Sequence, residues 1–318
     1  MSKVKIFAEN VAEQIKKYLP EHLQEGKLRV MEVIKNNDTC LIGLSFYTSE
    51  NVVIPVIYME SFYYRVQQGE SMEEVIKSIA ECLEQSAQVK ELPQLSTMAD
   101  YKSIEDYLMV VIVNTTTNRK MLSEMPHYEI EDLSIICEVS IPLVECEMSG
   151  SFKVTNDLLS KWGVTKEEVF EKAKKNTIQN LQPELYSMDS LIGFSENQDN
   201  LLQEGKELST NDFPMYILTN SKKRYGAVAL IFPQILERIE QLFSEGYYLL
   251  PSSIHELIVV PKNENMIPQE LGRLVREANR EDVLSEEVLS DRIYEYDKEA
   301  GKVCQVLESI EKTREWER

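Results

Sequence analysis

The segment Pro251–Glu256, P-S-S-I-H-E, brings together two hydroxyls, an imidazole and a carboxylate between two apolar runs. Ser252 or Ser253 is a candidate nucleophile and His255 its candidate base, with the Glu256 carboxylate beside them, because a serine attacks only when a base takes its proton. Two points argue against this chemistry. Ser253 and His255 are two residues apart and share a face in a strand, and the segment supplies no third residue to orient the histidine.

The hydrolase hypothesis therefore depends on whether these groups converge in a concave pocket. No G-x-S-x-G motif supports it. The alternative is a turn in which the hydroxyls cap backbone groups and His255 is hydrogen-bonded nearby. A buried His255 with both ring nitrogens engaged by backbone groups, and no cavity beside it, would end the hydrolase hypothesis.

Other catalytic patterns are missing from the sequence. His255-Glu256 resembles half of a zinc-protease motif, but Val259 stands where the second histidine is required. The chain has three histidines and no CxxC pair, and no glycine-rich phosphate loop occurs. We therefore expect neither a metal nor a cofactor. The widely spaced cysteines are typical of small buried hydrophobes in a reducing cytoplasm; they are Cys40, Cys82, Cys137, Cys146 and Cys304.

Two groups of side chains are candidates for binding. Lys222, Lys223 and Arg224 form the clearest basic cluster, at an expected hairpin tip that could dock an acidic partner or a phosphate. The simpler interpretation is a solvated turn. Tyr247 and Tyr248 could contribute to a groove, although half-buried core aromatics are the usual case.

The formal net charge of −20 excludes sequence-general nucleic-acid binding, because such a surface repels phosphate backbones. It leaves a protein partner open, and also a DNA-mimic inhibitor, which would need carboxylates in two rows at phosphate-like spacing. No apolar run reaches the length of a membrane span, and the N-terminal stretch is typical of an amphipathic helix, not a signal peptide. We expect a cytoplasmic protein without membrane contact, of undetermined oligomeric state.

The N-terminal elements predict an α-β-β-β-α unit. Apolar residues at three- and four-residue steps predict a helix over Lys3–Leu19. Three strands follow at Leu28–Lys35, Thr39–Tyr47 and Val52–Met59, with short turns that favour an antiparallel meander. Ser71-Met-Glu-Glu74 is a capping box that begins the next helix.

Later elements mix helices with hairpins and lack a βαβ rhythm, so the expected fold class is α+β with mainly antiparallel sheets and packed helices. The expected strands lie at Tyr107–Asn114, Leu133–Val144, Ser151–Thr155, Met215–Thr219, Gly226–Phe232, Tyr247–Leu250, Glu256–Val260, Arg292–Tyr296 and Val303–Leu307, and the helices at Asn118–Met125, after the capping box Thr165–Glu168, at Gln234–Ser244 and at Gln269–Ala278. The polar stretch 196–212 is a candidate linker between domains 1–195 and 213–318, or a surface loop inside a single domain.

Four segments carry a family resemblance: Tyr216–Asn220, Tyr225–Ala229, Leu249–Pro261 and Val288–Asp297. Through them the chain resembles an uncharacterised family of domain-of-unknown-function proteins from Firmicutes of the gut Clostridia, distantly similar to YtpQ-type proteins. The resemblance implies a bacterial cytoplasmic origin and brings no catalytic residues.

The leading functional hypothesis is a non-enzymatic protein-interaction or regulatory protein, chaperone-like in character. The acidic surface, the missing catalytic motifs and the α-β-β-β-α opening favour it, the last by analogy of fold only. Such a protein exposes an apolar or aromatic surface. An N-terminal sheet wholly covered by its own chain would count against the hypothesis. The alternative is the hydrolase built around Ser252, Ser253, His255 and Glu256.

Overall fold

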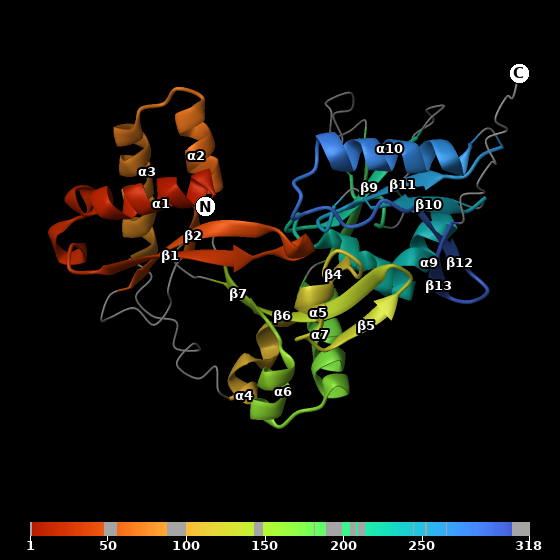
Figure 1. The fold of residues 1–318 in the computed structure, drawn as a ribbon. Coiled ribbons are helices and arrows are strands. Elements are labelled where there is room, and N and C mark those ends of the chain that lie inside the picture. The colour runs from red at the N-terminus through yellow and green to blue at the C-terminus, as the bar shows by residue number, and fades with distance from the viewer. Residues whose placement is uncertain are drawn as a thin grey trace, which may run out of the picture. The chain divides into compact units, whose positions relative to one another are not determined.

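The computed structural model describes residues 2–47, 56–87, 100–142, 149–180, 182–188, 199–203, 208, 214–243, 245–251, 253–264 and 266–306. The fold is α+β with antiparallel sheets, as predicted (Figure 1). The chain forms two compact units: unit 1 is Met1–Glu105 with Ser140–Ser151, and unit 2 is Asp106–Val139 with Phe152–Arg318. The expected linker at 196–212 lies largely outside the described residues, so a domain boundary there stays a prediction.

Unit 1 has the predicted α-β-β-β-α order, which ends in two helices. The strands form an antiparallel sheet in the order β1-β2-β3. Figure 1 shows the three longer helices on one side of β1 and β2. The elements are α1 (Lys3–Gln14), the 3₁₀ turns η1 (Ile15–Tyr18) and η2 (Glu21–Leu23), β1 (Lys27–Ile34), η3 (Asn36–Asp38), β2 (Cys40–Tyr47), β3 (Val56–Tyr58), α2 (Glu60–Gln67), α3 (Met72–Ala87) and α4 (Tyr101–Ile104).

Local sequence explains where the helices of unit 1 begin. The Ser2 hydroxyl caps α1 by accepting a hydrogen bond from the Lys5 amide. The capping box before α3 is confirmed, because Ser71 Oγ accepts from the Glu74 amide at 3.2 Å and Glu74 Oε2 accepts from the Ser71 amide at 3.3 Å. The apolar stripes of α1 and α3 then pack with Ile42, Leu44 and Phe46 of β2 into the core of this unit.

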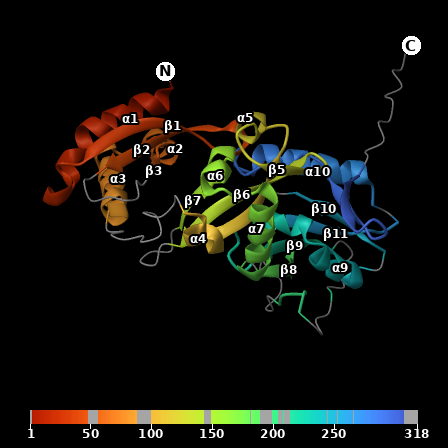
Figure 2. The ribbon, with the colours of Figure 1, turned by 90° about the horizontal axis from the view of Figure 1, so that it is seen from below.

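Unit 2 contains two sheets. One joins β4, β6 and β5 in that order, with β7 paired to β6; the last residues of β6 and the first of β7 belong to unit 1. The other has the order β13-β12-β10-β11-β9-β8. Figure 1 shows α10 on one side of β10 and β11 and α9 on the other, and Figure 2 gives the view from below. The elements are η5 (Glu105–Tyr107), β4 (Leu108–Asn114), α5 (Arg119–Leu122), β5 (His127–Ile130), β6 (Leu133–Pro142), β7 (Ser149–Lys153), α6 (Asn156–Trp162), α7 (Lys166–Asn180), β8 (Pro183–Ser187), β9 (Tyr216–Asn220), η6 (Gly226–Ile231), α9 (Pro233–Leu242), β10 (Tyr247–Leu250), β11 (Leu257–Pro261), α10 (Pro268–Glu281), β12 (Tyr294–Asp297) and β13 (Lys302–Gln305).

One expected strand is wrong. Gly226–Phe232 was expected to be extended, but Gly226–Ile231 forms the 3₁₀ helix η6, in which the residues from Gly226 to Leu230 are all buried. A run that is apolar at every position has neither period 2 nor period 3.6, so pattern alone does not separate a buried strand from a buried helix. The strands β5 and β8 and the helix α6 were not expected either.

Candidate functional site

The Pro251–Glu256 segment is the loop between β10 and β11, which pair as an antiparallel hairpin. Ser252 lies outside the described residues. Ser253 is buried, and its hydroxyl accepts a hydrogen bond from the His255 amide at 3.0 Å. The Ser253 amide in turn donates to the Glu256 carbonyl. The Ser253 hydroxyl therefore caps the backbone of its own loop, which is the arrangement expected for a structural turn.

The ring of His255 is held by two groups from elsewhere in unit 2. Its Nδ1 accepts a hydrogen bond from the Tyr225 amide at 3.1 Å, and its Nε2 lies 3.4 Å from Glu287 Oε1. Because Nδ1 acts as an acceptor, the proton of the neutral ring is on Nε2, facing the carboxylate. The ring then has no lone pair left for a serine proton, and no hydrogen bond between the Ser253 hydroxyl and this ring occurs in the described part of the loop.

The backbone of the loop is tied to β9 and η6 at the same position. The His255 carbonyl accepts hydrogen bonds from the Gly226 amide at 2.9 Å and from Thr219 Oγ1 at 3.0 Å. A Cβ added to Gly226 would lie 2.4 Å from that carbonyl oxygen and 2.7 Å from Thr219 Cα. Only glycine allows this approach, so the start of η6 fixes the position of the histidine.

Tyr225 connects the histidine to a buried carboxylate. Its ring centroid lies 5.7 Å from that of His255, and its hydroxyl is 3.4 Å from Glu138 Oε1. The Arg224 guanidinium lies 4.9 Å from the Tyr225 ring centroid. Burial raises the pKa of Tyr225, and the negative charge of Glu138 raises it further. Glu138 is only 2 % exposed. The cluster of Tyr225, Glu138 and Arg224 is therefore mostly packed inside unit 2, with His255 at its edge.

Sequence reasoning missed Glu138, Tyr225 and Glu287. Glu138 carried a signal, because it is a single charged residue inside the apolar run of β6 and such residues are rarely buried without a partner. Tyr225 and Glu287 each lie 30 or more positions from His255 along the chain, and no spacing rule connects them to it.

The three residues of the basic cluster differ in their exposure. Asn220 orders the turn, since its Oδ1 accepts from the Lys222 amide at 2.9 Å and its Nδ2 donates to the Arg224 carbonyl at 2.7 Å. Lys222 and Lys223 are exposed, whereas Arg224 is half-buried against the Tyr225 ring. This supports the solvated-turn interpretation for the two lysines.

The two neighbouring tyrosines are on opposite faces of β10 and cannot line one groove together. Tyr247 is buried, its hydroxyl donates to the Leu236 carbonyl at 2.9 Å, and burial raises its pKa. Tyr248 is half-buried, and the Lys262 ammonium lies 4.9 Å from its ring centroid. Tyr247 is thus a core residue whose polar end is satisfied by backbone.

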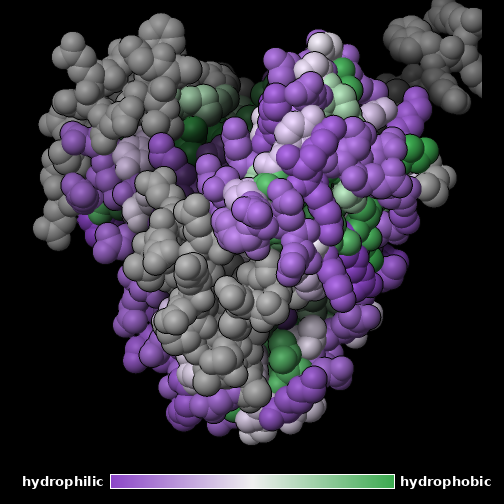
Figure 3. All heavy atoms as spheres, turned by 90° about the vertical axis from the view of Figure 1, so that its left-hand side faces the viewer, coloured by the Kyte–Doolittle hydropathy of each residue, from purple (hydrophilic) through white to green (hydrophobic). Residues whose placement is uncertain are grey.

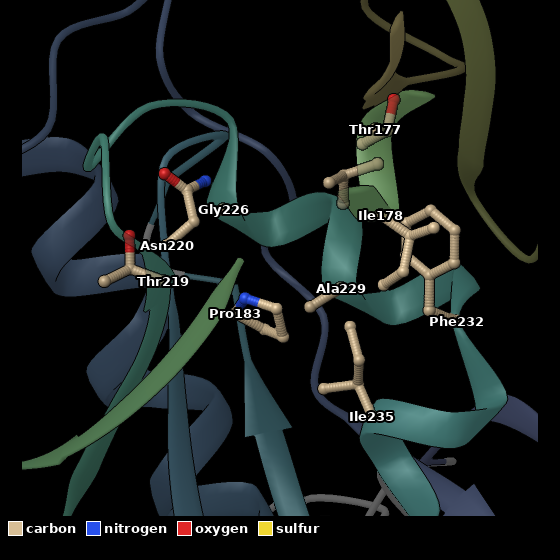
Figure 4. A pocket seen from close by; sticks show the side chains of 10 residues that line it. Thr177, Ile178, Pro183, Thr219, Asn220, Gly226, Ala229, Phe232 and Ile235 are labelled. Atoms are coloured by element: carbon tan, nitrogen blue, oxygen red, sulfur yellow. The ribbon is translucent and has the colours of Figure 1, made fainter. Parts of the chain in front are cut away.

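A small pocket lies among α7, β8, β9, η6 and α9, and Gly226, which bonds the His255 carbonyl, lines it. Figure 4 shows the side chains of Pro183, Ala229 and Ile235 facing the same space, with Thr219 and Asn220 on β9 beside it. The pocket offers about 10 Å³, which is the room of a single water molecule. It is therefore too small to hold a substrate next to the loop.

The sheet of unit 1 presents a second surface. Cross-strand register places Met31, Gly43 and Tyr58 opposite one another, on the face away from Ile42 and Leu44. Successive side chains of a strand alternate between faces, so every second residue of each strand lies on this face. These residues include an apolar set and two basic side chains. The apolar set is half-buried and consists of Met31, Val33, Leu41, Tyr47, Val56 and Tyr58; Lys27 and Arg29 are exposed. We call it the open face, because in the described residues the helical core of unit 1 forms on the other side.

The described residues contain no group of three or more histidine, cysteine, aspartate or glutamate side chains that could hold a metal ion. None of the helices within the described ranges is long and apolar enough to cross a membrane. Most side chains described on the side shown in Figure 3 are hydrophilic, in keeping with the charge of −20.

Comparison with known proteins identifies a family for this chain. A model of a family of unknown function, DUF5688, matches residues 4–298 and so covers nearly the whole chain. No curated protein and no solved structure matches. The match confirms the predicted resemblance to an uncharacterised family of domain-of-unknown-function proteins.

Proposed function

We propose, for a chain that belongs to the DUF5688 family of unknown function, a non-enzymatic role in which the open face of unit 1 binds another protein. The observation that carries the proposal is the one-sided packing of the β1-β2-β3 sheet. One face is covered by α1 and α3, and the other keeps six apolar side chains half-buried and therefore partly accessible to solvent. Partly accessible apolar surface of this kind is characteristic of protein-binding sites.

The centre of the open face is filled by neighbouring side chains. A Cβ on Gly43 would lie 2.5 Å from Val56 Cγ1 and 3.3 Å from Val33 Cγ2, so both valines occupy the space above the glycine. The Ser45 hydroxyl donates to Met31 Sδ at 3.0 Å and so offers no free donor to a partner there. The face is consequently a shallow apolar surface, suited to apolar side chains and not to a polar substrate.

Charge indicates which kind of partner fits this face. Its strand positions carry Lys27 and Arg29 but no acidic residue, and the Lys35 ammonium lies 4.2 Å from the Tyr58 ring centroid. On the helix-covered face, by contrast, Glu32 pairs with Lys5 at 3.0 Å. In a chain with a net charge of −20, this local basic edge favours an acidic segment with apolar side chains.

As expected from the sequence, we also propose that the protein is bacterial and cytoplasmic, that its role is chaperone-like or regulatory, and that it is distantly similar to YtpQ-type proteins. The hydrolase alternative receives no comparable support, because the His255 ring is engaged by the Tyr225 amide and Glu287.

The test compares four forms of the full chain, the wild type and three variants. Wild type is used to capture partners from the native host, and a captured protein is purified and titrated against Arg29→Glu, Val33→Ser and the control Lys16→Glu. Lys16 is exposed on η1, so its substitution makes the same charge change away from the open face. We expect an acidic partner whose affinity falls on the order of tenfold with Arg29→Glu and with Val33→Ser, and by less than about twofold with Lys16→Glu. A basic partner, equal binding by all variants, or no partner would refute the proposal.

A further inference from the structure

Unit 2 contains a pocket of about 330 Å³ where three turns meet. Its walls are Glu129–Glu131 at the tip of the β5–β6 hairpin, Leu230–Leu236 at the corner between η6 and α9, and Gly301–Val303 at the β12–β13 hairpin. The volume lies at the lower end of the range that small-molecule sites occupy. Of the candidate residues that the structure describes, none is in the lining of this pocket.

The floor of the pocket is apolar. Leu230, Leu236 and Val303 are buried, and Ile130 and Ile231 are half-buried. A second void, with room for about one water, shares Ile130, Leu230, Ile231 and Val303 with the pocket and is otherwise lined by apolar side chains and the buried Tyr294 ring. An apolar void of this kind gains nothing from holding water, so the floor favours the apolar part of a ligand.

The rim of the pocket is charged. Glu129, Glu131 and Lys302 are all exposed there, which gives two carboxylates against one ammonium. The negative excess, in a chain already at −20, favours a cationic group over an anionic one at this rim. An apolar floor under a net negative rim fits a molecule with an apolar body and one positive end.

The hairpin that carries the two glutamates is fixed in place. Asp132, next to Glu131, accepts hydrogen bonds from the Ser290 hydroxyl at 2.7 Å and the Tyr294 hydroxyl at 2.5 Å. The Thr115 amide donates to the Asp132 carbonyl at 2.8 Å. Glu131 itself has a φ of 55°, a left-handed conformation that a non-glycine residue adopts only when its surroundings impose it. The wall is therefore formed before any ligand arrives, which lowers the entropic cost of binding.

We propose that this pocket binds a small primary amine with an apolar body, whose ammonium group lies at Glu129 and Glu131 and whose hydrocarbon lies on Leu230, Ile231 and Val303. This site is separate from the open face and does not depend on the function proposed for it.

The experiment titrates the full chain with hexylamine, hexanol and hexanoate at low salt and follows binding by calorimetry and NMR. The three probes share one hydrocarbon body and differ in charge. We expect saturable binding of hexylamine in the millimolar range, weaker binding of hexanol, and the weakest binding of hexanoate.

Substitutions then identify the site. Glu131→Gln is expected to weaken hexylamine binding about two- to fivefold, the size of one exposed ion pair, and to leave hexanol unchanged. Lys302→Gln is expected to strengthen hexylamine binding by a similar factor. The control is Glu299→Gln, which removes the same charge as Glu131→Gln; Glu299 is exposed on the β12–β13 hairpin, which also carries Lys302, but it does not line the pocket. Equal binding of hexylamine and hexanol, an equal effect of Glu299→Gln, or no saturable binding would overturn the proposal.

Discussion

The imidazole of His255 accepts an amide proton at Nδ1, and this hydrogen bond decides what the ring can do. A histidine that acts as a general base needs a free lone pair toward its substrate. Here the lone pair belongs to the Tyr225 amide and the Nε2 proton faces Glu287, so the ring joins the β10–β11 loop to two other segments of unit 2. The residue types in Pro251–Glu256 are those of a hydrolase, but the hydrogen bonds described for Ser253 and His255 are those of a turn.

Tyr294 gives a prediction at the same scale. It is fully buried, and its hydroxyl donates to Asp132 Oδ1 at 2.5 Å. Burial, followed by the charge of Asp132, raises the pKa of Tyr294 above its usual value of about 10. The protonated tyrosine therefore stabilises the folded state fully below about pH 10, and this stabilisation is lost as the pH rises through the folded-state pKa.

We expect Tyr294→Phe to lower the free energy of unfolding at pH 7 by about 1–3 kcal/mol, because Asp132 loses a donor. The variant should also lose less stability than wild type between pH 10 and pH 11. Urea unfolding across this pH range measures both effects, with Tyr248→Phe, half-buried on β10, as the control. An alkaline decline identical to that of wild type would show that Tyr294 is not responsible.

At the scale of elements, η6 depends on one glycine. The Gly226 amide donates to the His255 carbonyl, and a Cβ at this position would meet backbone atoms of both Thr219 and His255. Backbone atoms cannot move aside as a flexible side-chain end can. We expect Gly226→Ala to destabilise unit 2 by at least about 3 kcal/mol, measured by urea unfolding.

Gly163→Ala is the matched comparison. Gly163 ends α6 with a φ of 67°, and no atom lies within 4 Å of its added Cβ. Gly163→Ala should lower the free energy of unfolding only by the cost of holding an alanine in the left-handed conformation, about 1–2 kcal/mol. Equal losses for the two variants would mean that the close approach at Gly226 contributes little.

The elements also show how far a sequence can be interpreted. Local sequence patterns predicted the structure correctly where a segment determines its own conformation. Thr165 and Glu168, for example, form the predicted capping box before α7. They failed at Gly226–Phe232, because burial and not periodicity selects the helix there. They located Ser253 and His255 but not Tyr225 or Glu287, since the contacts of a loop with distant segments exist only in the folded chain.

At the scale of the whole molecule, each unit has a hydrophobic core of its own. We therefore expect two calorimetric unfolding transitions. Leu44 in β2 and Leu257 in β11 are both fully buried. Leu44→Ala should destabilise unit 1 and lower one transition temperature, and Leu257→Ala should do the same for unit 2, each with the roughly 2–5 kcal/mol loss of a core truncation.

The exposed Leu274, at 46 %, provides the control, and Leu274→Ala should shift neither transition appreciably. A single transition that both core variants lower equally would show that the two cores unfold as one.

The division of the chain also has a consequence for synthesis. Unit 1 takes its last piece, Ser140–Ser151, from beyond the first stretch of unit 2, Asp106–Val139. A ribosome that has made Glu105 must add 46 more residues (151 − 105) before unit 1 is complete. At about 5–20 residues per second this takes roughly 2–9 seconds, during which β4, β5 and most of β6 emerge. Unit 1 is thus completed only after strands of the other unit have been synthesised, so the two units are interleaved in time as well as in sequence.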